Sequence, residues 1–221
     1  MSTARCSGLA LAPRLLVSAA VADLRRPEPF NPLERRHLAE AVADALLRSD
    51  HSRLPPEPFI GAGVYAIYYE GDFAPYRPIV KAGHPLYVGE ATPEGGRKGG
   101  GGAAAGPAIF SRLRQHARSI EQAQNLKLAQ FSCQYLVTDD IWIPLAENML
   151  IQRFRPIWNV VVDGFGNHDP GKGRYNQQRS AWDALHRGRD WAARCAECPK
   201  SQGQIVAEVE RHLRAVGLVK R

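Results

Sequence analysis

A small mixed α/β domain is the fold class that the sequence predicts, and three observations lead to it. Residues 61–69 and 86–89 are rich in apolar, β-branched and aromatic residues, and alternating apolar residues predict a third strand at 131–137. Apolar residues recur at helical spacing over 108–120 and 143–154. The order strand, strand, helix, strand, helix therefore predicts a small α/β core.

Length, charge and cysteine content limit the classes of function. The 221 residues, 44% of them hydrophobic, suffice for one domain with extensions. A formal net charge of +7 favours a polyanionic partner such as nucleic acid, although a moderately basic protein without such a partner has the same charge. No run approaches the roughly 20 apolar residues that cross a bilayer, so we expect no membrane partner.

The four cysteines fit a reducing, cytoplasmic setting better than a disulfide scaffold. Cys195 and Cys198 form half of a zinc motif, and no second pair stands at suitable spacing, so we expect no zinc.

The first segments along the chain are an extension and a helix. Residues 1–30 contain an apolar run that resembles a signal peptide but is broken by Pro13 and Arg14, and we expect a disordered or misassigned extension. Residues 31–58 are expected to form a helix and a linker, with Asn31 as a possible N-cap and Pro32 at the first helical position.

The central segment, residues 59–163, holds the predicted core. Its stretch 95–107 is a low-complexity, glycine-rich loop that cannot bury a core. This loop is either a tolerated surface insertion or a flexible basic loop whose Arg97 and Lys98 bind a backbone phosphate. After Pro156, residues 157–162 are expected to be extended.

Residues 164–221 are expected to belong to the same domain. They begin with the loop GFGNHDPGKGR and continue with helices around 182–195 and 205–216.

Glu147 stands out among the candidate functional residues because it lies in the apolar stripe of its helix. A buried carboxylate is costly unless it is paired or binds a cation. Tyr65 and Tyr87 lie in strands that can place both phenols on one sheet face, and Arg112 and His116 lie four residues apart beside an apolar stripe. Each of these residues also has an ordinary structural explanation, such as packing with a hydrogen-bonded tip for a strand tyrosine.

Taken together, these residues resemble a known family. Gly63-Val64-Tyr65 and Tyr87-Val88-Gly89, followed by Arg112, Glu147 and Asn159, resemble the GIY-YIG nuclease superfamily. Longer stretches resemble its small type II restriction endonucleases, in the branch that shares the SacII specificity; these stretches are LPPEPFIGAGVYAIYY, LYVGEATP, RLRQHARSI, FSCQYLV, PIWNVVVDGFGNHDPGKGR and RSAWDALHRGRDWAARC. His116 matches that branch, where other members commonly carry a tyrosine.

This resemblance implies a compact core with a small, mainly antiparallel three-stranded sheet flanked by helices, plus helical extensions at both ends. It also implies a cytoplasmic, site-specific endonuclease of a restriction–modification system. Such an enzyme would act as a homodimer on double-stranded DNA, at a GC-rich palindrome for which CCGCGG is the branch's site. A methyltransferase would be its genetic rather than its physical partner. The alternatives are a GIY-YIG repair or homing-type nuclease and a catalytically silent nucleic-acid-binding domain.

The resemblance also implies roles for single residues. Glu147 would be the only protein ligand of one Mg²⁺, or of Mn²⁺ in its place, and Arg112 would neutralise a phosphate oxygen. Tyr65 would be the candidate general base, with Arg112, the metal or His116 to lower its pKa or hold its proton, and Tyr87 would position the water or the phosphate. The sequence leaves open which of the two phenols gives up its proton. Asn159 would orient Glu147, a tyrosine or the substrate backbone by neutral hydrogen bonds.

DNA contacts would come from outside the catalytic set. The candidates are Arg97, Lys98, Arg114, Asn167, His168, Lys172 and Arg174. The alternative for the loop at 164–174 is a conformationally demanding turn. Four further arginines are expected to be phosphate contacts or plain surface charge: Arg118, Arg179, Arg187 and Arg189.

Overall fold

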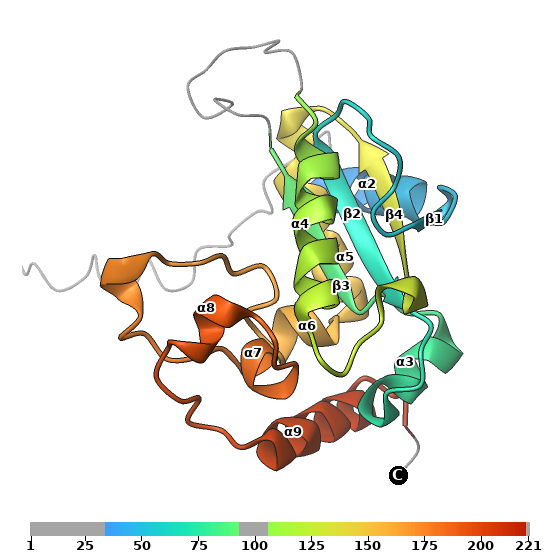
Figure 1. The fold of residues 1–221 in the computed structure, drawn as a ribbon. Helices are drawn as coiled ribbons and strands as arrows, with labels where there is room; N and C mark the ends of the chain where they lie inside the picture. Colours follow the sequence, from blue (N-terminus) through green and yellow to red (C-terminus); the bar gives the residue numbers. More distant parts are fainter. Residues whose placement is uncertain (1–33, 93–105, 220–221) are drawn as a thin grey trace, which may run out of the picture. The chain divides into compact units, whose positions relative to one another are not determined.

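The computed structural model describes residues 34–92 and 106–219, and all of its helices and strands fall within the compact unit Arg35–Arg221 (Figure 1). The expectations for residues 1–30, for most of the loop at 95–107, and for Arg97 and Lys98 concern residues outside the described part. Within the described part, no helix has the length and apolar character needed to cross a membrane.

An antiparallel sheet forms the centre of the fold. Its strands are β1 (Ser52–Arg53), β2 (Gly63–Tyr69), β3 (Tyr87–Ala91) and β4 (Phe131–Val137), in the spatial order β1-β4-β2-β3. The three predicted strands are confirmed. The sheet nevertheless has four strands instead of three, because the two-residue β1 pairs with β4.

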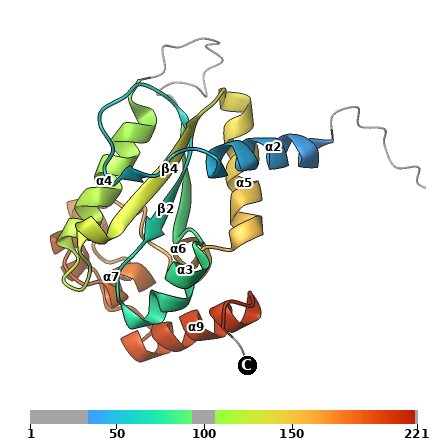
Figure 2. The same cartoon turned by 90° about the vertical axis from the view of Figure 1, so that its right-hand side faces the viewer.

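Helices cover both faces of the sheet, and this explains why every residue of β2 is buried. Helix α4 (Ala108–Gln122) covers one face, while α2 (Arg35–Leu47) and α5 (Ile143–Phe154) cover the other (Figure 2). Side chains alternate along β2, so that Tyr65 points to the α4 face and Val64 to the α5 face. The strand-and-helix pattern read from the sequence therefore gives the observed three layers.

The predicted helices at 108–120 and 143–154 are confirmed as α4 and α5. Helix α5 ends at Arg155, whose φ of 44° is left-handed, and Pro156 follows. The extended segment predicted at 157–162 is wrong, because residues Ile157–Val160 form the helical turn α6. Its β-branched composition suggested a strand, but the turn buries Ile157 and Trp158 together, and tertiary packing outweighs local propensity.

The C-terminal part packs below the sheet (Figure 1). The helix predicted around 182–195 is divided into α7 (Ala181–Leu185) and α8 (Asp190–Ala193). Gly188 separates them with a φ of 148°, and a Cβ there would collide with the carbonyl of Gln122.

The helix predicted at 205–216 is confirmed as α9 (Gln202–Ala215), which begins with a capping box at Ser201. The remaining elements are short: η1 (Ala74–Tyr76), α3 (Arg77–Ala82), η3 (Leu128–Gln130), η4 (Asp140–Trp142) and η5 (Lys172–Arg174).

Candidate active site at the edge of the sheet

A cavity of about 610 Å³ lies beside β3, the strand at the edge of the sheet. Tyr87 and Glu90 of β3, Arg112 of α4 and Glu147 of α5 all line it. Three residues predicted from separate sequence segments, Tyr87, Arg112 and Glu147, are therefore brought to one place. The charged side chains of Glu90, Arg112 and Glu147 and the polar side chains of Ser111 and Gln115 line it, which suits a charged substrate.

The two phenols occupy different positions on the same sheet face. Tyr65 lies opposite Gly89 in the β2–β3 register, and the Tyr65 and Tyr87 ring centroids are 6.3 Å apart. Tyr65 is fully buried, whereas Tyr87 lines the cavity. The missing side chain of Gly89 leaves the space for Tyr65, because a Cβ there would lie 2.5 Å from its Oη.

His116 and Tyr65 form a buried hydrogen-bonded pair. The distance from Tyr65 Oη to His116 Nε2 is 2.8 Å. Burial and the neighbouring Tyr87 raise the pKa of Tyr65 well above its usual value, while burial and the charge of Arg112 hold the pKa of His116 well below its own. Both groups are thus neutral near pH 7, and in the tautomer that leaves Nε2 unprotonated the phenol donates to it.

Arg112 is held by a residue that the sequence interpretation assigned to DNA reading. Its Nη1 donates to His168 Nε2 at 2.7 Å and to Gln115 Oε1 at 3.2 Å. His168 belongs to the loop that follows α6, and burial and the charge of Arg112 lower its pKa. The structure therefore brings His168 to Arg112, the arginine predicted to neutralise a phosphate oxygen.

Phe165 of the same loop is a site residue that the sequence interpretation missed. Its ring stacks on His116 with centroids 4.4 Å apart and an interplanar angle of 17°, and the side chain is buried. An aromatic residue between two glycines was the only signal in the sequence, and nothing there indicated its partner.

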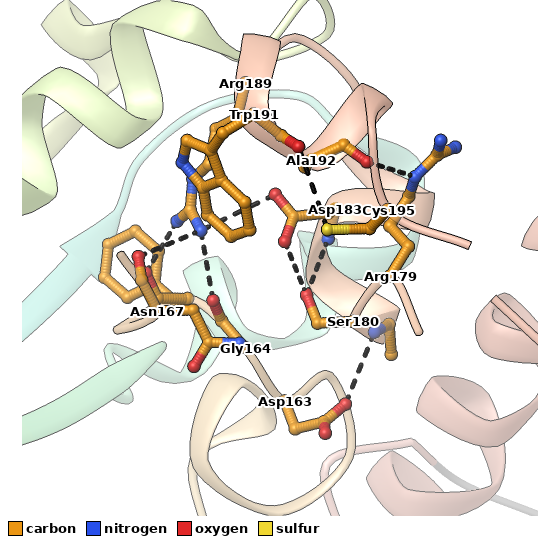
Figure 3. A network of polar contacts seen from close by, with 12 residues as sticks. Asp163, Gly164, Asn167, Arg179, Ser180, Asp183, Arg189, Trp191, Ala192 and Cys195 are labelled. Carbon is orange, nitrogen blue, oxygen red and sulfur yellow. Dashed lines mark hydrogen bonds and ion pairs between the residues drawn. The ribbon is translucent and has the colours of Figure 1, made fainter. Parts of the chain in front are cut away.

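Arg189 fixes the backbone of this loop. The prediction that Arg189 is surface charge or a phosphate contact is wrong. Its side chain is 2% exposed. The guanidinium donates to the carbonyl oxygens of Gly164 at 3.1 Å, Asn167 at 3.4 Å and Phe165 at 2.6 Å (Figure 3). These three bonds hold the segment between α6 and α7 that carries Phe165 and His168.

Two further contacts explain why Arg189 is tolerated inside the protein. Its guanidinium carbon lies 4.1 Å from the centroid of the Trp182 ring, and Nη1 lies 3.5 Å from Asp183 Oδ1. Burial lowers the pKa of Arg189 to about 10, against the opposing effect of Asp183, so the guanidinium stays charged at neutral pH. The charge is compensated by a carboxylate, three carbonyl dipoles and an aromatic face.

Glu147 is half-buried on α5, as the helical pattern predicted. Burial and the carboxylate of Glu90 raise the pKa of Glu147 to about 7, while Arg112 acts in the opposite direction. Glu90 was missed by the sequence interpretation, although it directly follows Tyr87-Val88-Gly89. Its Oε2 is buried and has no hydrogen-bond partner among the described residues.

These donors fit a hydrated Mg²⁺ or Mn²⁺ better than a fully protein-ligated ion. Carboxylate oxygens are the ligands that these cations prefer, and Mg²⁺ usually keeps several waters. Within residues 34–92 and 106–219, no group of three or more His, Cys, Asp or Glu side chains could hold a metal ion. The carboxylates at the cavity, one of them with an unpartnered buried oxygen, are thus compatible with one partly hydrated cation.

Asn159 positions a strand rather than a side chain of the cavity. Its Nδ2 donates to the carbonyl of Val88 at 2.8 Å, and its Oδ1 accepts from the amide of Val88 at 2.9 Å. These bonds occupy the free edge of β3 between Tyr87 and Gly89. Asn159 therefore fixes the strand that presents Tyr87 and Glu90.

Three of the remaining candidates for DNA contact have side chains that the structure describes. Arg114 is exposed on α4, with its guanidinium carbon 5.6 Å from the Phe110 ring centroid, and Asn167 and Arg174 are exposed. The side chain of Lys172 lies outside the described part.

Comparison with protein families gives a match. The family model described as the Eco29kI GIY-YIG domain matches residues 57–213, a range that includes Tyr65 and the cavity residues Tyr87, Glu90, Arg112 and Glu147. A search of curated proteins gives no match.

Proposed function

The chain belongs to the Eco29kI GIY-YIG family of restriction endonucleases, and we propose that it is a metal-dependent, site-specific endonuclease of double-stranded DNA. The observation that carries this proposal is the cavity at the edge of β3, where a phenol, a guanidinium and a carboxylate from three elements meet. Hydrolysis of a phosphodiester needs a positioned water, stabilisation of negative charge and a path for a proton.

Arg112 is the group that binds the scissile phosphate. Its guanidinium is oriented by His168 and Gln115 and reaches the cavity. A guanidinium can donate two parallel hydrogen bonds to phosphate oxygens, and such charge-assisted bonds are stronger than neutral ones. We assign Arg112 the stabilisation of the charge that develops on the phosphate.

Glu147 is the residue that would hold a divalent cation. When bound, the cation supplies charge stabilisation for the scissile phosphate and the leaving oxygen. Side chains of the chain itself bind the phosphate and carry the proton away from the attacking water.

Tyr87, Tyr65 and His116 provide the path for the proton. The attacking water forms a bond to phosphorus and gives its proton to the Tyr87 phenol, which lines the cavity. Tyr87 passes its own proton to Tyr65, and Tyr65 passes its proton to His116 Nε2. The bond from phosphorus to the leaving oxygen breaks, and that oxygen takes a proton from solvent. The 2.8 Å contact between Tyr65 Oη and His116 Nε2 supports this path, and because burial and Arg112 hold the pKa of His116 low, the imidazole carries the proton only transiently before it leaves to solvent.

Cleavage of both strands requires two such sites. A two-fold dimer on a palindrome would place one site on each strand. The net charge of +7 and the exposed Arg114 and Arg174 support binding to the DNA backbone. The target we propose is CCGCGG, the site of the branch that the sequence resembles.

Plasmid cleavage tests this proposal. Two plasmids that differ only in one CCGCGG site are incubated with the full chain in Mg²⁺ or in EDTA. We expect one double-strand cut, only in the plasmid with the site and only with Mg²⁺, and we expect Glu147→Gln to abolish it. Glu121→Gln, at an exposed carboxylate on α4, is the matched control and should cut normally. Binding without cutting would indicate a silent DNA-binding domain, and random nicking would indicate a repair-type nuclease.

A further inference from the structure

The side chain of Glu90 comes to the cavity from the same sheet face as α5. Glu90 pairs with Val64 in the β2–β3 register, and directly opposite residues of an antiparallel pair point to the same face. Val64 packs in the cluster that contains Ile143, Ala146 and Leu150 of α5. Glu147 lies on that helix, so Glu90 and Glu147 approach the cavity from facing elements.

One oxygen of the Glu90 carboxylate is buried without a protein partner, although the residue as a whole is partly exposed. Its Oε2 is removed from solvent and lacks a hydrogen bond within the described residues, and unsatisfied buried charge is unfavourable. The ordinary explanation for such a residue would be an ion pair, but no ion pair of Glu90 occurs among residues 34–92 and 106–219.

The cavity has fewer positive than negative groups among its lining side chains. Glu90 and Glu147 contribute two carboxylates, and Arg112 contributes one guanidinium. A DNA phosphate entering this cavity would add a further negative charge next to two carboxylates, which repel it. A divalent cation shared by the carboxylates removes that repulsion and satisfies the orphaned oxygen.

We propose that Glu90 is a second protein ligand of the divalent cation that Glu147 holds. This assignment rests on the proposed nuclease function and deepens it, since the resemblance implies a single carboxylate ligand. Its consequence is measurable without DNA: two carboxylates on facing elements should bind the ion in the free protein, because affinity for hard cations rises with the number of charged ligands.

Isothermal titration of MnCl₂ into the DNA-free full chain tests the assignment. Glu90→Gln and Glu147→Gln keep the side-chain shape and remove one charge each, and Glu121→Gln is the control. We expect Glu90→Gln to weaken Mn²⁺ binding by roughly tenfold or more, as Glu147→Gln does, and we expect the control to bind like the wild type.

Thermal unfolding provides the second readout, and it shows whether each variant is folded. Mn²⁺ should raise the Tm of the wild type by mass action and raise that of Glu90→Gln much less. Without Mn²⁺, Glu90→Gln should be at least as stable as the wild type, because the repulsion between the carboxylates is gone.

Two outcomes would overturn the assignment: Mn²⁺ binding in Glu90→Gln equal to the wild type, or no Mn²⁺ binding by the wild type without DNA. Either can occur while the wild type still cuts the CCGCGG plasmid in Mg²⁺, so the inference can fail while the proposed function stands. If the wild type binds Mn²⁺ through Glu90 and Glu147 but cuts no DNA, the proposed nuclease function is contradicted and the assignment of the cation site stands.

Discussion

Gly89→Ala should inactivate the proposed nuclease without removing any catalytic group. A Cβ at Gly89 would lie 2.5 Å from Tyr65 Oη, 2.7 Å from Tyr65 Cζ and 2.9 Å from Tyr87 Cε1. Ordinary contacts of a Cβ begin at 3.4 Å, so the Tyr65 ring has to move by about 0.9 Å, the difference between 3.4 and 2.5 Å. Tyr65 is fully buried and its Oη is hydrogen-bonded to His116, so a shift of the ring disturbs this contact.

The two expected effects of this substitution differ in size. Overpacking in a closed core costs about 1–3 kcal/mol of stability. A shift of roughly 1 Å in a positioned group can cost on the order of 100-fold in rate. We therefore expect a modest loss in Tm and a large loss in the single-turnover cleavage rate, with DNA affinity nearly unchanged because neither Arg112 nor any exposed arginine is touched.

Gly203→Ala is the matched control for this experiment. Gly203 lies in α9, and a Cβ there would meet nothing within 4 Å. The exchange should stabilise the protein by about 0.5–1 kcal/mol and leave cleavage unchanged. If Gly89→Ala cuts at the wild-type rate while its Tm falls, the reasoning that Tyr65 must keep its position over Gly89 is refuted.

Three further predictions follow from buried polar contacts. Arg189→Lys cannot bond three carbonyls with a planar fork, so it should lower the cleavage rate more than the DNA affinity; equal losses in both would contradict this. Asn159→Ala removes two bonds to Val88 at the edge of β3 and should lower stability by about 1–3 kcal/mol, measured by denaturant unfolding. Burial lowers the pKa of His186 to about 3, so as the pH falls the unfolded chain takes up a proton on this histidine before the folded chain does. The contribution of neutral His186 to the stability of the fold is therefore complete above about pH 6.5 and is lost as the pH falls toward 3. The Tm of His186→Gln should depend less on pH over that range than the Tm of the wild type.

Periodicity predicted most of the fold because it reports burial directly. The apolar stripe of α4 and the alternation in β4 each follow from which face of the element meets the core. The error at residues 157–162 arose because composition, not periodicity, was the basis of the prediction there. Composition favoured a strand there, but the backbone edge of β3 next to it is occupied by the Asn159 side chain, and the segment turns helical so that Ile157 and Trp158 are buried.

Only the site residues that belong to a recognisable sequence motif could be predicted from the sequence. Tyr87, Arg112 and Glu147 stand in a fixed order along the chain, and the fold brings them to one cavity. Glu90 and Arg189 carry no such mark. The position of Glu90 depends on the β2–β3 register, and the burial of Arg189 depends on carbonyls more than 20 residues away in the chain, so both needed the tertiary structure.

The contact between His168 and Arg112 links the loop after α6 to the chemistry. His168 was predicted to read DNA, yet its Nε2 accepts a hydrogen bond from Arg112 at 2.7 Å. The same nitrogen cannot accept from a base while it holds the guanidinium. His168 Nε2 therefore becomes available to DNA only when Arg112 exchanges it for another acceptor, and a phosphate in the cavity is such an acceptor. Arg189 holds the backbone carbonyls of this loop in place. The side chains of the loop can therefore respond to DNA while its backbone stays fixed.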